Sequence, residues 1–241
     1  EGSRLLFSDV PGNAVYQWTE ADSASVLIGD YFDGGSEGQF RGPNGLTRDA
    51  EGRVVIADHG RRQITRVEPD GSYTSVADSY NGARLNSPND LVYHSDGSLY
   101  FTDPPYGLEG MNDSLLREQP VNGVYRVSTD GQVELVSQEH ALPNGLAFSP
   151  DESVLYVADT DPTQLGWTAY DVGPDGLANP QVLLDATGGA GEGGGDGLKV
   201  DRQGNLFATG PGGVWVIAPD GTHLGTISPA ETPSNVAWGE D

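Results

Sequence analysis

The sequence predicts an all-β protein, a β-propeller built of four-stranded antiparallel blades. Three observations carry this prediction. A polar corner followed by two short strands recurs along the chain, Asp-Gly turns separate short β-branched and aromatic runs, and no segment keeps a helical period over three turns. A repeat of a few tens of residues that contains several short strands is typical of propellers.

The repeat is clearest around Asn144, where Leu142–Phe148 gives a corner and a first strand. Leu155–Asp159 then gives a second strand that ends in Asp. The step from a corner residue to the end of its second strand is 14 or 15 residues in four places. The corner residues are Asn44, Asn89, Asn144 and Asp196, and the strand ends are Asp58, Asp103, Asp159 and Gly210.

β-Branched and aromatic residues dominate the remaining runs, as they do in strands. The predicted second strands are Leu5–Asp9, Val54–Asp58, Leu99–Asp103, Leu155–Asp159 and Leu206–Gly210. The third strands are Ala14–Trp18, Ile64–Val67, Gly123–Val127, Trp167–Val172 and Gly213–Ile217. The fourth strands lie near Ser25–Ile28, Tyr73–Ala77, Val133–Val136, Gln181–Leu184 and His223–Ile227.

Five first strands follow the four corner residues and Ser234, and the last of them is Asn235–Trp238. That strand has no partner after it, whereas Leu5–Asp9 has no first strand before it. We therefore expect the N- and C-terminal strands to pair in one blade, which closes a ring of five blades and removes sheet edges. The predicted organisation is a single propeller domain over residues 1–241.

Composition limits the function classes. The net charge is −24 with a single lysine, Lys199, so nucleic acid and anionic membrane are disfavoured as partners. The acids are spread over the loops, which favours a solvated acidic coat over a calcium-rich or acidic-ligand site. There is no apolar run near 18 residues and no leader-like start, so we expect a soluble protein, cytoplasmic or periplasmic. The absence of cysteine excludes disulfides and leaves the compartment open.

Several long phrases match one family. The most specific are Asn86–Asp90, Tyr100–Gly107 and Pro143–Glu152, with Leu5–Gly12 and Asp196–Leu198 beside them. With these phrases nearly the whole chain resembles the senescence-marker-protein, gluconolactonase and luciferin-regenerating-enzyme-like family. Members of that family are six-bladed propellers. Compared with them, about one blade is expected to be absent here, together with the Glu of a Glu-Gly-Pro-x-Trp first strand.

The resemblance implies a metal-dependent hydrolase of small sugar lactones, with its site at the mouth of the central channel and Ca²⁺ or another divalent cation as cofactor. The family's metal-binding Asn and Asp match Asn144 and Asp196. Asn89 matches the Asn that contacts the substrate or metal-bound water, so the candidate metal site consists of Asn144, Asp196 and Asn89. Asp196 would also act as general base and Asn89 would stabilise the oxyanion, so Asn89 and Asp196 are the candidate catalytic residues. Oxygen ligands that converge on an axis suit a hard cation.

The ligand set has one weakness. The family's Glu has no equivalent in this chain, and Ser234 stands at the analogous corner. Because calcium affinity depends on the ligand charge count, a single carboxylate predicts weakened binding unless another acid moves in. The candidates for that acid are Asp90, Asp103, Asp159, Asp161 and Glu192.

Four residues are candidates for substrate binding. Asn44 is a corner residue, Asp103 and Tyr106 belong to the Thr-Asp-Pro-Pro-Tyr phrase, and His59 is a possible acid or base near neutral pH. The alternatives are an Asx-type turn for each Asn, a turn hydrogen bond for the strand-end Asp residues and a surface position for His59. Loops 104–122 and 188–195 are expected to shape the pocket or to act as solvated connectors.

Two rival functions stay open. One is a five-bladed scaffold, natural or engineered, that has lost efficient catalysis with the missing blade, and the other is a propeller that serves as a binding module. The missing Glu favours the scaffold, whereas Asn89, Asn144 and Asp196 favour the lactonase. We expect a monomer because closure leaves few open edges, with a domain-swapped dimer as the alternative.

Overall fold

The structure is a computed structural model that describes residues 4–35, 37–40, 42–174 and 176–239. Within that part the regular structure is almost entirely β, and the one helix is a 3₁₀ turn, η1 (Met111–Asp113). None of its helices has the length and hydropathy needed to cross a membrane. The chain divides into two compact units, Glu1–Leu135 with Gly239–Asp241 and Val136–Trp238. The expectation of a single domain stays a prediction.

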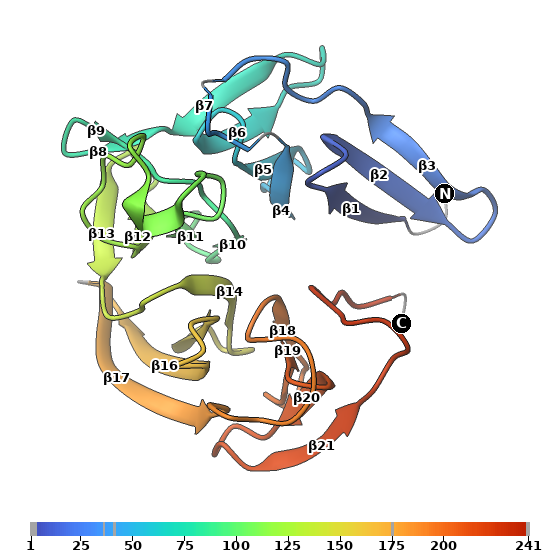
Figure 1. Ribbon diagram of the computed structural model, residues 1–241, viewed down its shortest axis with the longest axis vertical. Coiled ribbons are helices and arrows are strands. Elements are labelled where there is room, and N and C mark those ends of the chain that lie inside the picture. Colours follow the sequence, from blue (N-terminus) through green and yellow to red (C-terminus); the bar gives the residue numbers. More distant parts are fainter. Residues whose placement is uncertain (1–3, 36, 41, 175, 240–241) are drawn as a thin grey trace. The chain divides into compact units, whose positions relative to one another are not determined.

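The first unit contains antiparallel sheets whose strands follow one another in chain order (Figure 1). The first sheet has three strands, β1 (Leu5–Asp9), β2 (Ala14–Thr19) and β3 (Ser23–Ile28). The second has four, β4 (Pro43–Arg48), β5 (Val54–Asp58), β6 (Gln63–Val67) and β7 (Tyr73–Ala77). A small ladder of β8 (Ser79–Tyr80) and β9 (Ala83–Arg84) precedes β10 (Leu91–Tyr93), β11 (Leu99–Asp103), β12 (Gly123–Val127) and β13 (Val133–Ser137).

The second unit repeats the pattern twice. One sheet is formed by β14 (Pro143–Phe148), β15 (Val154–Asp159), β16 (Gly166–Gly173) and β17 (Gly176–Asp185). The other is formed by β18 (Leu198–Val200), β19 (Leu206–Gly210), β20 (Gly213–Ile217) and β21 (His223–Ile227). Such consecutive antiparallel strands are the construction of propeller blades, so the predicted fold class and its repeat are confirmed.

The first sheet departs from the prediction. Asn235–Trp238 form no strand, and β1 pairs with β2 alone among the described strands. The predicted pairing of the terminal segments, which belong to different units, stays a prediction. The C-terminal segment instead makes contacts within its own unit. Gly197 N donates to Ser234 O over 2.9 Å, and the Trp238 ring meets Phe207 edge-on at 4.9 Å between centroids. Trp238, which the sequence assigns to a strand, thus packs against Phe207 of β19.

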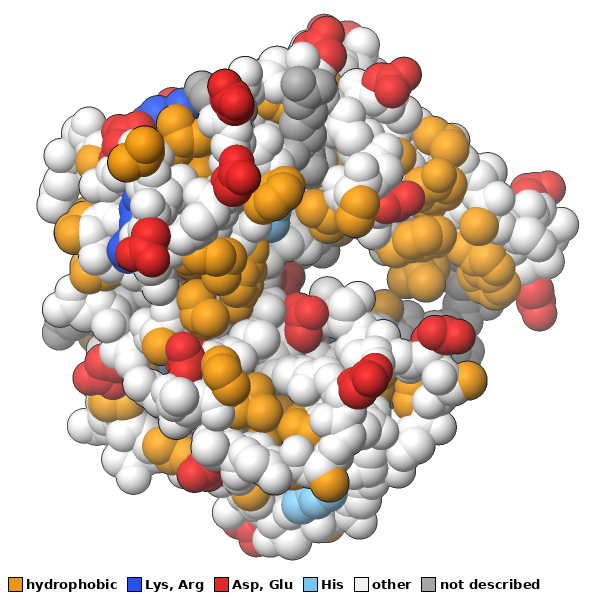
Figure 2. Space-filling model, viewed as in Figure 1, with side chains coloured by type: hydrophobic (Ala, Val, Ile, Leu, Met, Phe, Trp, Pro, Cys, Tyr) orange, Lys and Arg blue, Asp and Glu red, His pale blue; other side chains and the backbone are white. Residues whose placement is uncertain are grey.

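The cores lie between neighbouring sheets of each unit. In the first unit Ile64 and Phe101 belong to one buried cluster that joins the sheet of β4–β7 to that of β10–β13. In the second unit Trp167 and Leu206 belong to a cluster that joins its two sheets. Full burial of one such side chain contributes about 1.5–3 kcal/mol. Asp and Glu side chains are dispersed over the face shown in Figure 2.

Candidate functional site

The predicted corner residues lie where the first strands begin. Asn44 is the second residue of β4 and Asn144 the second residue of β14, whereas Asn89 and Asp196 lie just before β10 and β18. Asn44 and Asn89 belong to the first unit, and Asn144 and Asp196 to the second. The repeat therefore places polar side chains at equivalent positions, as the spacing predicts.

In the first unit, one amide nitrogen joins three polar side chains. Asn44 Nδ2 donates to Asn89 Oδ1 over 2.6 Å and lies 3.2 Å from His59 Nε2. The backbones are joined as well, because Gly45 N donates to Asn89 O over 2.8 Å. Ser8 Oγ donates to Asn44 O over 2.5 Å from β1. The two corners are thus held together by both main chain and side chain.

His59 is buried, with 3% of its surface exposed, so the surface alternative is wrong. Burial lowers the pKa of His59 to about 4, and the imidazole is therefore neutral at pH 7. A neutral ring can accept a hydrogen bond from Asn44 at Nε2 when Nδ1 carries the proton. In this structure His59 is therefore a hydrogen-bond acceptor, and not the acid or base near neutral pH that the sequence predicts. Contact with substrate stays a prediction.

Asp103 holds the segment that leads to Asn89. It is completely buried, and its carboxylate accepts from Asn86 N over 2.7 Å and from Ser87 N over 2.9 Å. Burial raises the pKa of Asp103 to about 7, against the opposing effect of these two hydrogen bonds and of Arg62. In the structure this carboxylate orders a corner loop. Its proposed contact with substrate stays a prediction.

The loop after Asp103 covers His59. Phe40 N donates to Gly107 O over 2.8 Å, and Gln39 and Leu108 form a β-bridge, so the loop packs along the 37–40 segment. A Cβ atom at Gly107 would lie 3.0 Å from His59 Cγ, which places the loop backbone directly on the imidazole. Tyr106 is half-buried beside it. Part of loop 104–122 is therefore ordered structure that lines the His59 site.

In the second unit the corner residues form an analogous network. Asn144 Nδ2 donates to Thr160 Oγ1 over 2.9 Å, and Thr160 Oγ1 donates to Gly195 O over 2.5 Å. Asp196 N donates to Thr209 Oγ1 over 3.0 Å. The hydroxyl of Thr160 thus links the Asn144 amide to the glycine-rich loop that enters Asp196.

Glycines permit the corners to lie close together. A Cβ atom on Gly145 would lie 2.3 Å from Asp196 O, and one on Gly45 would lie 2.7 Å from Asn89 O. Neither position has room for a side chain. The Gly of the Asn-Gly phrase therefore serves the approach of neighbouring first strands, a role that the sequence argument, centred on the Asn, missed.

The acids considered as replacement ligands are mostly engaged elsewhere. Asp159 accepts from Ala141 N over 2.8 Å and from Leu142 N over 3.1 Å, so it orders the loop that precedes Asn144. Asp161 accepts from the backbone and hydroxyl of Thr163, and Asp90 accepts from Leu91 N. Asp103 is engaged as described above, and Glu192 is exposed.

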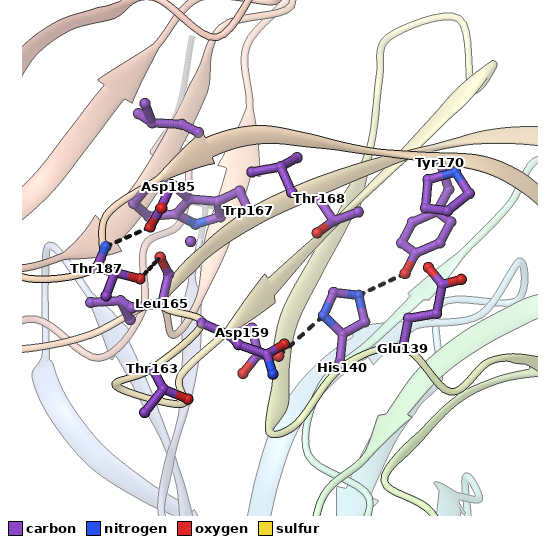
Figure 3. A pocket seen from close by; sticks show the side chains of 15 residues that line it. Glu139, His140, Asp159, Thr163, Leu165, Trp167, Thr168, Tyr170, Asp185 and Thr187 are labelled. Carbon is purple, nitrogen blue, oxygen red and sulfur yellow. Dashed lines mark hydrogen bonds and ion pairs between the residues drawn. The ribbon is translucent and has the colours of Figure 1, made fainter.

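A pocket of about 410 Å³ lies in the second unit, beside β16 and β17 (Figure 3). His140 lies between Asp159 and Tyr170. Its Nδ1 is 3.4 Å from Asp159 Oδ2, and its Nε2 is 2.9 Å from the Tyr170 hydroxyl. That hydroxyl lies 3.0 Å from Ser137 Oγ. No corner residue lines this pocket. These four side chains contact one another, and Asp159 also holds the segment that leads into β14, so we assign the network a structural role. No sequence signal beyond the strand-end Asp159 marks this network.

The donor set determines which cation fits. No group of three or more His, Cys, Asp or Glu side chains is placed to hold a metal among the described residues. The corner residues offer amide and carboxylate oxygens from Asn144 and Asp196, which suit a hard cation such as Ca²⁺ better than a soft one. Thr160 Oγ1 accepts from Asn144 Nδ2, and this contact fixes the orientation of the amide.

Comparison with known proteins gives consistent results. Residues 1–241 match the family model described as the SMP-30/Gluconolactonase/LRE-like region. The gluconolactonase of Zymomonas mobilis is 41% identical over 253 residues, which cover 99% of this chain and 70% of that protein. The chain thus spans about seven tenths of this relative's length.

Solved structures show the same fold. A gluconolactonase of Xanthomonas campestris matches with a TM-score of 0.85 and 34% identity, over 98% of this chain and 76% of its own. Regucalcin of Agrobacterium tumefaciens, a calcium-binding protein, matches with a TM-score of 0.72 and 19% identity. The match covers 97% of this chain and 73% of regucalcin. This second likeness concerns the fold alone.

Proposed function

The chain belongs to the SMP-30/gluconolactonase/LRE-like family, and we propose that it hydrolyses small sugar lactones in a metal-dependent reaction. The observation that carries the proposal is the 41% identity to a gluconolactonase over 99% of the chain. The placement of Asn89, Asn144 and Asp196 at equivalent corners supports it. The proposed substrate is a neutral small molecule, which is compatible with a net charge of −24.

We assign the metal to Asn144 and Asp196. Thr160 orients the Asn144 amide by accepting from its Nδ2, and Asp196 supplies the single carboxylate of this pair. Their strands approach closely at Gly145, which fixes one ligand relative to the other. When bound, a divalent cation polarises the lactone carbonyl and lowers the pKa of water.

The residues of the chain supply the remaining chemistry. Asp196 accepts the proton of the attacking water, and Asn89 donates from Nδ2 to the carbonyl oxygen as negative charge develops on it. Asn89 is oriented for that task, since its Oδ1 already accepts from Asn44. In the first unit Asn44 contacts Asn89 directly, His59 contacts Asn44, and Asp103 orders the segment that leads to Asn89. Asn44, Asp103, Tyr106 and His59 are the proposed substrate contacts.

Hydrolysis of glucono-1,5-lactone at pH 7, with CaCl₂ or with a chelator, tests the proposal. We expect turnover above spontaneous hydrolysis in calcium, loss of it in chelator, and a drop of about 100-fold or more in Asp196→Asn. Asp171→Asn, an equal charge change on the exposed face of β16, serves as the control and should keep full activity.

Turnover that never exceeds spontaneous hydrolysis would overturn the proposal. The chain would then be an inactive propeller of this family. Equal activity in Asp196→Asn and the native chain would instead refute the assigned site while leaving the lactonase activity in place.

A further inference from the structure

The residue that follows a strand-end aspartate contacts a corner amide in both units. His59 follows Asp58 and lies 3.2 Å from Asn44 Nδ2, and Thr160 follows Asp159 and accepts from Asn144 Nδ2 over 2.9 Å. The two residues have different chemistry but present an acceptor to the same atom of an equivalent side chain. This recurrence indicates a role for the position rather than a chance contact.

The direction of the Asn44 amide follows from its partners. Its Nδ2 lies 2.6 Å from Asn89 Oδ1 and 3.2 Å from His59 Nε2, so its two hydrogens serve two acceptors. The flipped amide would place Oδ1 2.6 Å from another amide oxygen, which is repulsive. Because Oδ1 of Asn89 faces Asn44, Nδ2 of Asn89 points away from it.

The imidazole is held in place by its surroundings. Gly107 lies close to the Cβ and Cγ atoms of His59, and Gln39 Nε2 donates to His59 O over 3.1 Å. The side chain of Asp58 is directed elsewhere, toward Tyr31, Arg61 and Thr65, and leaves the imidazole to Asn44. His59 is therefore a fixed acceptor.

We propose that His59 is a positioning residue, which orients Asn89 through Asn44 so that the Nδ2 of Asn89 faces the substrate carbonyl. His59 donates no proton to the reaction. Its Nε2 accepts one hydrogen of the Asn44 amide, and this commits the other hydrogen to Asn89 Oδ1. The catalytic consequence rests on the proposed lactonase function, whereas the orientation itself does not.

The first test needs no activity. Long-range ¹H–¹⁵N correlation on the native chain at pH 7 reports the tautomer of each histidine, and His59→Gln identifies the signals of His59 by their loss. We expect a neutral ring with the proton on Nδ1 and none on Nε2. A protonated ring, or a proton on Nε2, would overturn the proposal, because neither can accept from Asn44.

The second test is kinetic. His59→Leu removes the acceptor, and His59→Gln can restore one through its side-chain oxygen. We expect His59→Leu to lower kcat by about 10–100-fold with KM within about threefold, because the Asn89 contact matters most in the transition state. His59→Gln should recover kcat to within about fivefold. Equal kcat values in the two variants would contradict the proposal.

The two tests separate the two hypotheses. The Nδ1–H tautomer in a chain without lactone turnover supports the orientation and refutes the proposed function. Turnover together with the other tautomer refutes the role of His59 and supports the proposed function. If His59→Leu does not fold, the tautomer of the native chain still decides.

Discussion

Gly145 lies between the two proposed metal ligands. It follows Asn144, and a Cβ atom at this position would lie 2.3 Å from the carbonyl oxygen of Asp196. The approach of the two first strands therefore depends on the absence of a side chain. This single hydrogen in place of a methyl group sets how closely the Asn144 and Asp196 backbones can lie.

Gly145→Ala should lower the free energy of unfolding by about 1–3 kcal/mol, because the added methyl group must displace the neighbouring strand. It should also weaken calcium binding. Urea unfolding monitored by tryptophan fluorescence measures the first effect. Gly225→Ala in β21 is the control, since a Cβ atom there has nothing within 4 Å and should change stability little or favourably. A Gly145→Ala chain as stable as the native one would contradict this account of the corner.

The corner residues can be recognised in the sequence because their spacing repeats. Which amide atom faces which neighbour cannot be read from the repeat, since it depends on residues outside it. His59 shows the reason. Gly107, which lies close to the buried His59, belongs to a loop that packs along residues 37–40, and no pattern around His59 contains that contact. The prediction from the ordinary pKa of histidine therefore missed its chemistry.

At the scale of elements, Arg61 joins three parts of the first unit. Its guanidinium lies 4.7 Å from the Tyr31 ring centroid, 4.9 Å from that of Phe32 and 4.4 Å from that of Tyr73. It also donates to Asp58 Oδ2 over 3.1 Å. The turn after β5 is thus connected to the segment after β3 and to β7.

Arg61→Met should destabilise the chain by about 1–3 kcal/mol, because Asp58 loses its cationic partner and three rings lose a cation–π contact. Arg61→Lys should recover little of this loss, since an ammonium group cannot stack on rings as a guanidinium does. Thermal unfolding measures both effects, with the exposed Arg4→Met as the control. If Arg61→Met were as stable as Arg4→Met, the contacts of Arg61 would contribute nothing measurable to the free energy of unfolding.

The strands themselves were predictable to within a residue or two at most ends, because turn residues and alternating apolar runs define them locally. The exception, Asn235–Trp238, is informative. Its composition suits a strand, but a strand needs a partner, and its contacts to Gly197 and Phe207 supply none. Ladder pairing between distant segments is not encoded in either segment alone.

At the scale of the whole molecule, two buried groups oppose each other in the dependence of stability on pH. The folded chain keeps His59 neutral down to about pH 4, whereas the histidine of the unfolded chain binds a proton below pH 6.5. The neutral His59 therefore contributes to the free energy of unfolding above pH 6.5, and this contribution is lost as pH falls toward 4. Asp103 has a pKa of about 7 in the folded chain, against an ordinary value of 3.8. Its contribution to the free energy of unfolding is therefore complete below pH 3.8 and is lost as pH rises toward 7.

Between pH 4 and 6.5 the two effects should nearly cancel in the native chain. Asp103→Asn leaves the His59 effect, so its stability should rise with pH by up to about 1.4 kcal/mol per unit. His59→Gln leaves the Asp103 effect, so its stability should fall with pH by a similar amount. Urea unfolding at several pH values measures the slopes. Parallel profiles for the native chain and both variants would show that neither group titrates as described.

The central claim is that the corner residues of this family member bind a divalent cation through Asn144 and Asp196. Isothermal titration calorimetry with Ca²⁺, on the native chain and on Asp196→Asn, tests it most directly. The account predicts one saturable site with a Kd of roughly 1 mM or tighter, as expected for a site with few carboxylates, and a loss of at least tenfold in the variant. Binding that is absent, or equally strong in both proteins, would contradict the claim.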